Sequence, residues 1–192
     1  MRHRLHLFDT PESLAATVTS FFVEGYNAGG NLLIIAKPQH RAAILSALQT
    51  AGCFPQDSNG RQRLIALDAT EILERITRDG SIDDDLFYGC VAPLVHKLAA
   101  RGKLWIYGEV VELLAEQQDF VGAVRLEGLW NGLAAQCPFT LLCGYSSSHF
   151  APSTHRSALC DICGTHTHSA ASNADTLGEW LLGTAHAPVT SP

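Results

Sequence analysis

Apolar runs and apolar residues at helical spacing alternate along most of this chain. A continuous apolar run predicts a strand that is covered on both faces, whereas apolar residues three and four positions apart predict a helix that buries one face. The predicted strands are 4–8, 31–36, 64–67, 103–107 and 139–145. The predicted helices are 11–30, 40–51, 71–78, one that carries the apolar residues from Phe87 to Leu98, and two between 109 and 138.

Strands that alternate with helices favour a doubly wound sheet. We therefore predict a three-layer α/β fold with a mostly parallel central sheet. The composition changes after Tyr145, where a Ser-rich loop begins. Beyond it we expect a short helix over 155–163, a weakly ordered stretch over 164–173 and one or two helical turns over 177–182.

Charge and composition exclude several classes of function. The net charge is −6, and the 13 Lys and Arg residues form no basic stripe, so we expect no direct contact with nucleic acid. Apolar runs fall short of the roughly 18 residues that a membrane helix needs, and the N-terminus lacks the apolar core of a signal peptide. We expect a cytoplasmic protein whose six cysteines are reduced thiols or metal ligands.

Two glutamates stand where the pattern expects core residues. Glu109 follows an apolar strand and a glycine, and Glu127 lies in an apolar helix segment, with Asn131 four positions on and so on the same helix face. An unpaired buried charge costs several kcal/mol, so such groups are normally paired, hydrogen-bonded or placed in a wet cleft. We predict a ligand pocket from these three residues with Tyr107 and Trp130 as its walls.

His40 is added to this pocket because it begins a helix after the strand 31–36, and ligands of doubly wound sheets bind at the carboxyl ends of strands. Each assignment has a structural alternative. In these alternatives Glu109 serves only as a cap of the following helix, Glu127 and Asn131 form a polar pair that fixes one helix, and His40 is an ordinary first-turn residue.

A second candidate site is the local pattern C-x2-C-x2-H-x-H, formed by Cys160, Cys163, His166 and His168. Thiolates and imidazoles are preferred zinc ligands, so zinc is the one cofactor that the sequence suggests. The alternatives are cysteines that pack inward from a helix and a redox-active CxxC pair.

Catalytic motifs are missing. The strand-to-helix junction at 36–40 has no glycine and contains Pro38, which removes an N–H donor, so it does not match the phosphate loop GxxxxGK[ST]. The chain also has no G-x-S-x-G nucleophile motif. We therefore predict a protein that is not an enzyme, with a divergent nucleotide-binding enzyme as one rival.

The order of GEVVELL, LEGLWN, TLLCGY and ICGTHTH, preceded by FFVEGYNAGG and NLLIIA, resembles the MEDS domain. This is the sensory domain named for methanogens, methylotrophs and the dichloromethane-responsive regulator DcmR. The resemblance implies a degenerate RecA/KaiC-like fold without a phosphate-binding loop, and a domain over 1–168 with a tail over 169–192 that holds a short helix. One departure is Phe8-Asp9, where the family often has a tyrosine before the acidic residue.

The resemblance further implies a sensory module that binds a small molecule. Since we see no kinase, receiver or helix-turn-helix signature, we expect the signal to pass to a separate protein, such as a histidine kinase or a transcription regulator. The apolar residues Trp180, Leu181 and Leu182 are compatible with homodimer formation. The rival from another class is a metal or redox switch built on the late Cys and His residues.

Overall fold

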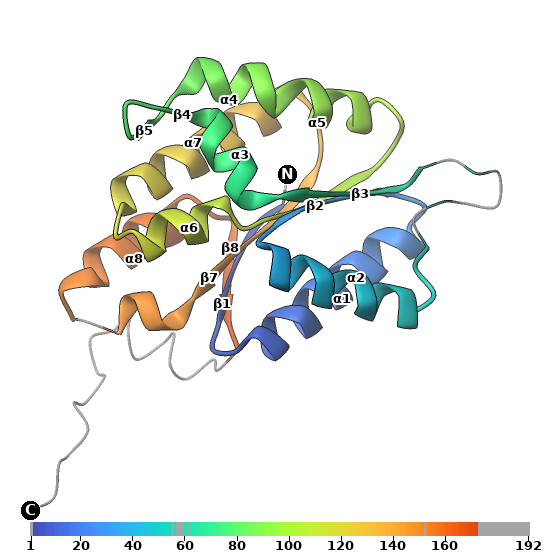
Figure 1. The fold of residues 1–192 in the computed structure, drawn as a ribbon, viewed down its shortest axis with the longest axis horizontal. Coiled ribbons are helices and arrows are strands. Elements are labelled where there is room, and N and C mark those ends of the chain that lie inside the picture. Colours follow the sequence, from blue (N-terminus) through green and yellow to red (C-terminus); the bar gives the residue numbers. More distant parts are fainter. Residues whose placement is uncertain (1, 55, 57–59, 61, 152, 173–192) are drawn as a thin grey trace, which may run out of the picture.

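A six-stranded sheet, in which all neighbouring strands are parallel, forms the centre of the protein (Figure 1). The computed structural model describes residues 2–54, 56, 60, 62–151 and 153–172. The strand order is β3-β2-β6-β7-β1-β8. The strands are β1 (Arg2–Phe8), β2 (Asn31–Ala36), β3 (Leu64–Asp68), β6 (Leu104–Gly108), β7 (Thr140–Ser146) and β8 (His168–Ala171).

Helices cover both faces of this sheet, which confirms the three-layer α/β fold (Figure 1). Along β2, Leu32 and Ile34 pack into one core cluster while Leu33 and Ile35 pack into the other, as expected for a strand buried on both faces. One face carries α1 (Pro11–Asn27) and α2 (Pro38–Thr50). The other carries α3 (Ala69–Ile76), α4 (Asp84–Cys90), α5 (Ala92–Ala99), α6 (Val110–Glu116), α7 (Phe120–Gln136) and α8 (Arg156–Gly164).

Two predicted elements differ from the structure between β3 and β6. The helix expected to carry Phe87 to Leu98 is divided into α4 and α5. Pro93 lies in the first turn of α5, where a helix does not need its N–H. In the interior of one continuous helix, the missing N–H would remove a hydrogen bond and the ring would clash with the preceding turn. Before α4 the chain forms a short hairpin that the apolar pattern does not predict, with β4 (Thr77–Arg78) antiparallel to β5 (Ser81–Ile82).

The stretch 164–173, expected to be weakly ordered, contains the edge strand β8. The sequence of β8, HSAA, has no apolar pattern that predicts a strand. The strand forms because it pairs with its neighbour β1. The short helix expected over 177–182 lies outside the described residues. In the part of the chain that the structure describes, no helix is both long and apolar enough to cross a membrane.

The connections diverge at the carboxyl ends of β2 and β6. From β2 the chain leads through α2 on one face to the outer strand β3. From β6 it leads through α6 and α7 on the opposite face to β7, in the other direction. Neighbouring strands whose connections leave in opposite directions define the point where parallel α/β sheets usually bind ligands.

Two glycine substitutions test the packing of the sheet against α1. A Cβ at Gly25 in α1 would lie 2.7 Å from the Trp105 ring, whereas a Cβ at Gly128 in α7 meets nothing within 4 Å. We expect Gly25→Ala to lower the free energy of unfolding by about 1–3 kcal/mol through overpacking. Gly128→Ala should raise it by about 0.5–1 kcal/mol, because alanine is the better helix former. Urea unfolding measures both, and equal effects would contradict the packing described.

Candidate functional site

Three polar residues meet at the carboxyl ends of β2 and β6. Glu109 directly follows β6, Lys37 directly follows β2, and His40 lies in the first turn of α2. The Glu109 side chain is fully buried; it accepts a hydrogen bond from the Lys37 backbone N–H at 2.7 Å and pairs with Nδ1 of His40. Glu109 is the N-cap residue of α6, but its side chain makes no capping hydrogen bond.

A second buried carboxylate, Glu112, lies one turn further along α6. It accepts hydrogen bonds from the Ser146 backbone N–H at 2.8 Å and pairs with Nε2 of His149 at 3.0 Å. The ammonium of Lys37 lies 3.6 Å from Glu112 and 2.6 Å from Glu116. Burial lowers the pKa of Lys37, but its hydrogen bond to Glu116 and the nearby carboxylates outweigh this and raise the pKa above its ordinary value.

The end of β1 reaches the same edge. The ring of Phe8 packs edge-on against His40, with centroids 5.9 Å apart, and Asp9 accepts a hydrogen bond from the Ser147 hydroxyl at 2.5 Å. The phenylalanine at position 8 therefore contributes an apolar contact to His40 rather than a hydroxyl. We call the residues Lys37, His40, Glu109, Glu112 and His149 the edge cluster.

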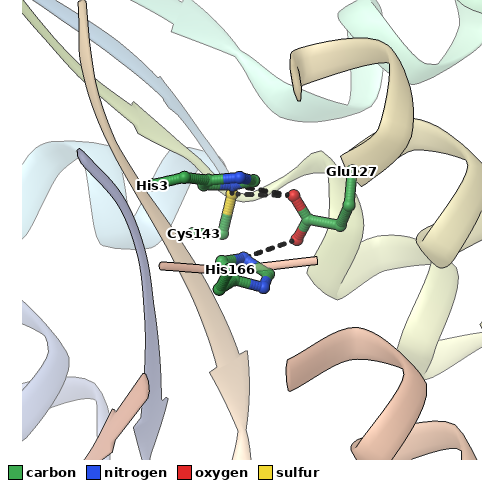
Figure 2. Close-up of side chains that lie close together, drawn as sticks. All are labelled: His3, Glu127, Cys143 and His166. Atoms are coloured by element: carbon green, nitrogen blue, oxygen red, sulfur yellow. Dashed lines mark hydrogen bonds and ion pairs between the residues drawn. The ribbon is translucent and has the colours of Figure 1, made fainter. Parts of the chain in front are cut away.

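A separate group of polar side chains is buried between the sheet and α7 (Figure 2). Glu127 of α7 points toward His3 of β1, Cys143 of β7 and His166, which follows α8. Its Oε2 lies 3.1 Å from Nε2 of His3 and 3.3 Å from Sγ of Cys143, and its Oε1 lies 3.3 Å from Nε2 of His166. We call these four residues the inner cluster.

Electrostatics in the inner cluster centre on one fully buried carboxylate. Burial by itself raises the pKa of Glu127, but the charges of His166 and His3 outweigh burial and hold the pKa far below its usual range. For His166, burial lowers the pKa and the charge of Glu127 more than restores it, so the pKa is raised. Burial, and then the charge of Glu127, raises the pKa of Cys143 and of Tyr145, whose hydroxyl donates to Glu127 at 2.8 Å.

Sequence reasoning assigned one pocket to residues that the structure divides between several places. Glu109 and His40 lie in the edge cluster. Glu127 and Asn131 lie one turn apart on α7, as their spacing predicted, and both contact His3. Ligand contact by any of these residues stays a prediction.

The two expected aromatic walls lie on opposite faces of the sheet. Tyr107 packs on the side of α1 and α2, whereas Trp130 packs against Phe87 and Phe139 on the side of α7. A strand residue and its neighbour point to opposite faces, and the sequence pattern did not reveal which face each residue takes.

The late Cys and His residues are spread over α8 and β8. The Cys160 side chain is exposed, Cys163 is half-buried, His168 is exposed on β8, and His166 turns inward to Glu127. Metal binding by the four together stays a prediction.

Instead, the described residues bring together two other groups with metal-ligating atoms within 4.8 Å of one another. These are the inner cluster and the set Glu112, Glu116 and His149.

Sequence reasoning did not single out Lys37, Glu112 or His3. A histidine in the apolar strand RHRLHLF was the available signal for His3. The others needed the strand order, since residues that meet here, such as His3 and His166, are up to 163 positions apart.

The buried environment of Glu109 predicts a large difference from Glu116, whose side chain is 43% exposed. In the wild type, both Glu109 oxygens face nitrogen groups, those of the Lys37 backbone and the His40 ring. In Glu109→Gln the side-chain NH₂ group replaces one of these oxygens and cannot accept a hydrogen bond, so the free energy of unfolding should fall by about 1–3 kcal/mol. In Glu116→Gln the change should stay below about 1 kcal/mol, because solvent screens the exposed pair with Lys37. Urea unfolding compares the two, and an equal or reversed order would contradict the burial of Glu109.

One family of known proteins matches most of this chain. The sequence model described as "MEDS: MEthanogen/methylotroph, DcmR Sensory domain" matches residues 2–167, from the first residue of β1 to the residue before β8. None of the curated proteins matches the chain. The match spans both clusters in full, and the chain belongs to the MEDS family of sensory domains.

Proposed function

We propose that this domain is a non-catalytic sensor that binds a small organic ligand at the edge cluster and signals through a separate protein partner. Membership in a family of sensory domains indicates a sensory or regulatory role. The observation that carries the proposal is the meeting of Lys37, His40 and Glu109 at the divergence of β2 and β6. This is where parallel α/β sheets usually bind their ligands.

The polarity of the edge cluster favours a ligand with an anionic or hydrogen-bond-accepting group. Glu109 engages Nδ1 of His40, and Glu112 engages Nε2 of His149, so the opposite nitrogen of each neutral ring offers a lone pair to a ligand, and the accessible donor that favours an anionic group is the Lys37 ammonium. The two histidine side chains are 12% and 19% exposed, and that of Lys37 is 21% exposed, whereas Glu109 and Glu112 are buried. A ligand therefore meets the nitrogen groups and not the two buried carboxylates.

A route from ligand to partner follows from the contacts of Glu112. This carboxylate holds the end of β7 through Ser146 and the following 3-10 helix (Ser147–Phe150) through His149. A ligand that draws Lys37 or His149 away from Glu112 would change how this segment is held at the surface. Such a ligand acts as a signal only if it binds the two arrangements with different affinity.

Thermal-shift screening of the full chain tests this function. The panel would hold short carboxylates, inorganic phosphate, neutral alcohols, primary amines and nucleotides with magnesium. We expect stabilisation by one anionic class and no nucleotide turnover. Stabilisation by amines alone, or hydrolysis of a nucleotide, would contradict the proposal.

Binding should depend on Lys37 more than on other lysines. For the compound that stabilises the protein, we expect Lys37→Met to weaken binding about tenfold or more, because a charge-assisted hydrogen bond is lost. The control is Lys97→Met, which removes an exposed lysine on α5. Titration calorimetry gives both dissociation constants, and equal values for the two variants would place the ligand away from the edge cluster.

A further inference from the structure

We propose that the inner cluster is a zinc site, in which His3, Glu127, Cys143 and His166 bind one Zn²⁺ ion. This site lies between the sheet and α7 and shares no residue with the edge cluster. It also differs from the local C-x2-C-x2-H-x-H pattern, with which it shares only His166. A zinc measurement therefore tests it independently of any ligand at the edge cluster.

The distances among the donor atoms of His3, Glu127 and Cys143 are close to those of tetrahedral zinc ligands. With metal–ligand bonds of about 2.0–2.3 Å, the ligands of tetrahedral zinc lie about 3.3–3.7 Å from one another. Nε2 of His3 lies 3.1 Å from Oε2 of Glu127 and 3.4 Å from Sγ of Cys143, which in turn lies 3.3 Å from Oε2 of Glu127. Nε2 of His166 lies 3.3 Å from the other carboxylate oxygen, and one donor atom from each of the four residues lies within 4.8 Å of the others (Figure 2).

Hydrogen bonds at the far side of each ring prepare the histidines as ligands. Asn131 donates its Nδ2 to the Thr165 carbonyl at 2.9 Å, so its Oδ1 faces Nδ1 of His3, also at 2.9 Å, and that nitrogen carries the hydrogen. Nδ1 of His166 lies 2.7 Å from the Ile162 carbonyl, which only accepts. In both neutral rings the lone pair is then on Nε2, directed at the centre of the cluster, and outer partners of this kind typically orient metal-bound histidines.

His166 supplies the observation that most directly points to a missing cation. Its Nε2 is buried and makes no hydrogen bond to any described residue. The nearby Oε1 of Glu127 is already the acceptor for the Tyr145 hydroxyl at 2.8 Å. A nitrogen lone pair facing a carboxylate is repulsive unless the ring takes up a proton or a cation lies between them, and a buried polar atom without a partner costs about 1–3 kcal/mol.

Charge balance favours a divalent ion with a thiolate ligand. Binding forms a Zn–S bond, and the Cys143 thiol proton leaves to the solvent. The thiolate and the Glu127 carboxylate then carry two negative charges that Zn²⁺ neutralises, while both imidazoles stay neutral. A mixed set of sulfur, imidazole nitrogen and one carboxylate is typical of zinc and unsuited to magnesium or calcium, which prefer oxygen ligands.

Native mass spectrometry and cobalt substitution of the full chain test the site. We expect the purified protein to carry a mass excess of one zinc ion per chain, which a chelator removes. Co²⁺ added to the metal-free protein should give a thiolate-to-metal absorption band and the intense visible bands of a tetrahedral ion. A wild-type protein that takes up neither ion would overturn the proposal.

Variants locate the metal. Cys143→Ser should abolish the thiolate-to-cobalt band, whereas the double variant Cys160→Ser, Cys163→Ser should keep it. The opposite pattern would place the metal on the C-x2-C pattern and overturn the inner site. Asn131→Ala keeps every ligand and should weaken zinc binding about 10- to 100-fold, as expected for a residue that positions His3. The Asn131→Ala variant keeps the test decisive if Cys143→Ser fails to fold, and an unchanged zinc affinity in Asn131→Ala would contradict the site.

Discussion

The buried carboxylate of Glu127 is the interaction around which the far side of the sheet is arranged. It contacts side chains from β1, from β7 and from the segment between α8 and β8, although these lie far apart in sequence. An ionised carboxylate without water costs several kcal/mol unless its partners supply compensating charge or donors. The positions of His3, Tyr145 and His166 therefore follow from one requirement, and they join the N-terminal strand to the last described segment.

The parallel sheet separates this inner cluster from the edge cluster. The six strands of this sheet run the same way, so the carboxyl ends of β1, β2, β6 and β7 meet at one edge, and Lys37, Glu109 and Glu112 are brought there by the chain direction alone. The inner cluster lies instead on one face, beneath α7. Solvent reaches Lys37 and the histidines of the edge cluster, so this cluster is suited to an exchangeable ligand. Solvent does not reach the side chains of the inner cluster, which is suited to a resident ion.

Sequence reasoning succeeded where a property was local. The apolar run NLLIIA is β2, and the spacing of Glu127 and Asn131 correctly placed them on one helix face. It failed where the structure of a segment depends on a particular residue or on contacts with a distant segment. Strand β8 is held by pairing with β1 rather than by its own pattern, and Pro93 divides a helix that the apolar spacing alone favoured.

The candidate sites show the same limit. The polar character of Glu109 and Glu127 was visible in the sequence, but their separation into two clusters was not, because it depends on strand order and on which face each strand residue takes. Likewise the C-x2-C-x2-H-x-H pattern drew attention to His166, whereas its structural neighbours His3 and Cys143 stand alone in distant strands.

X-ray absorption at the zinc edge of the purified protein tests the central claim most directly, because it counts the ligands by element. The account predicts one sulfur at about 2.3 Å and three nitrogen or oxygen ligands at about 2.0–2.1 Å. Two sulfur ligands would assign the metal to Cys160 and Cys163, and the absence of zinc from protein purified without chelator would leave Glu127 neutralised by its histidines alone. Either result would contradict the account.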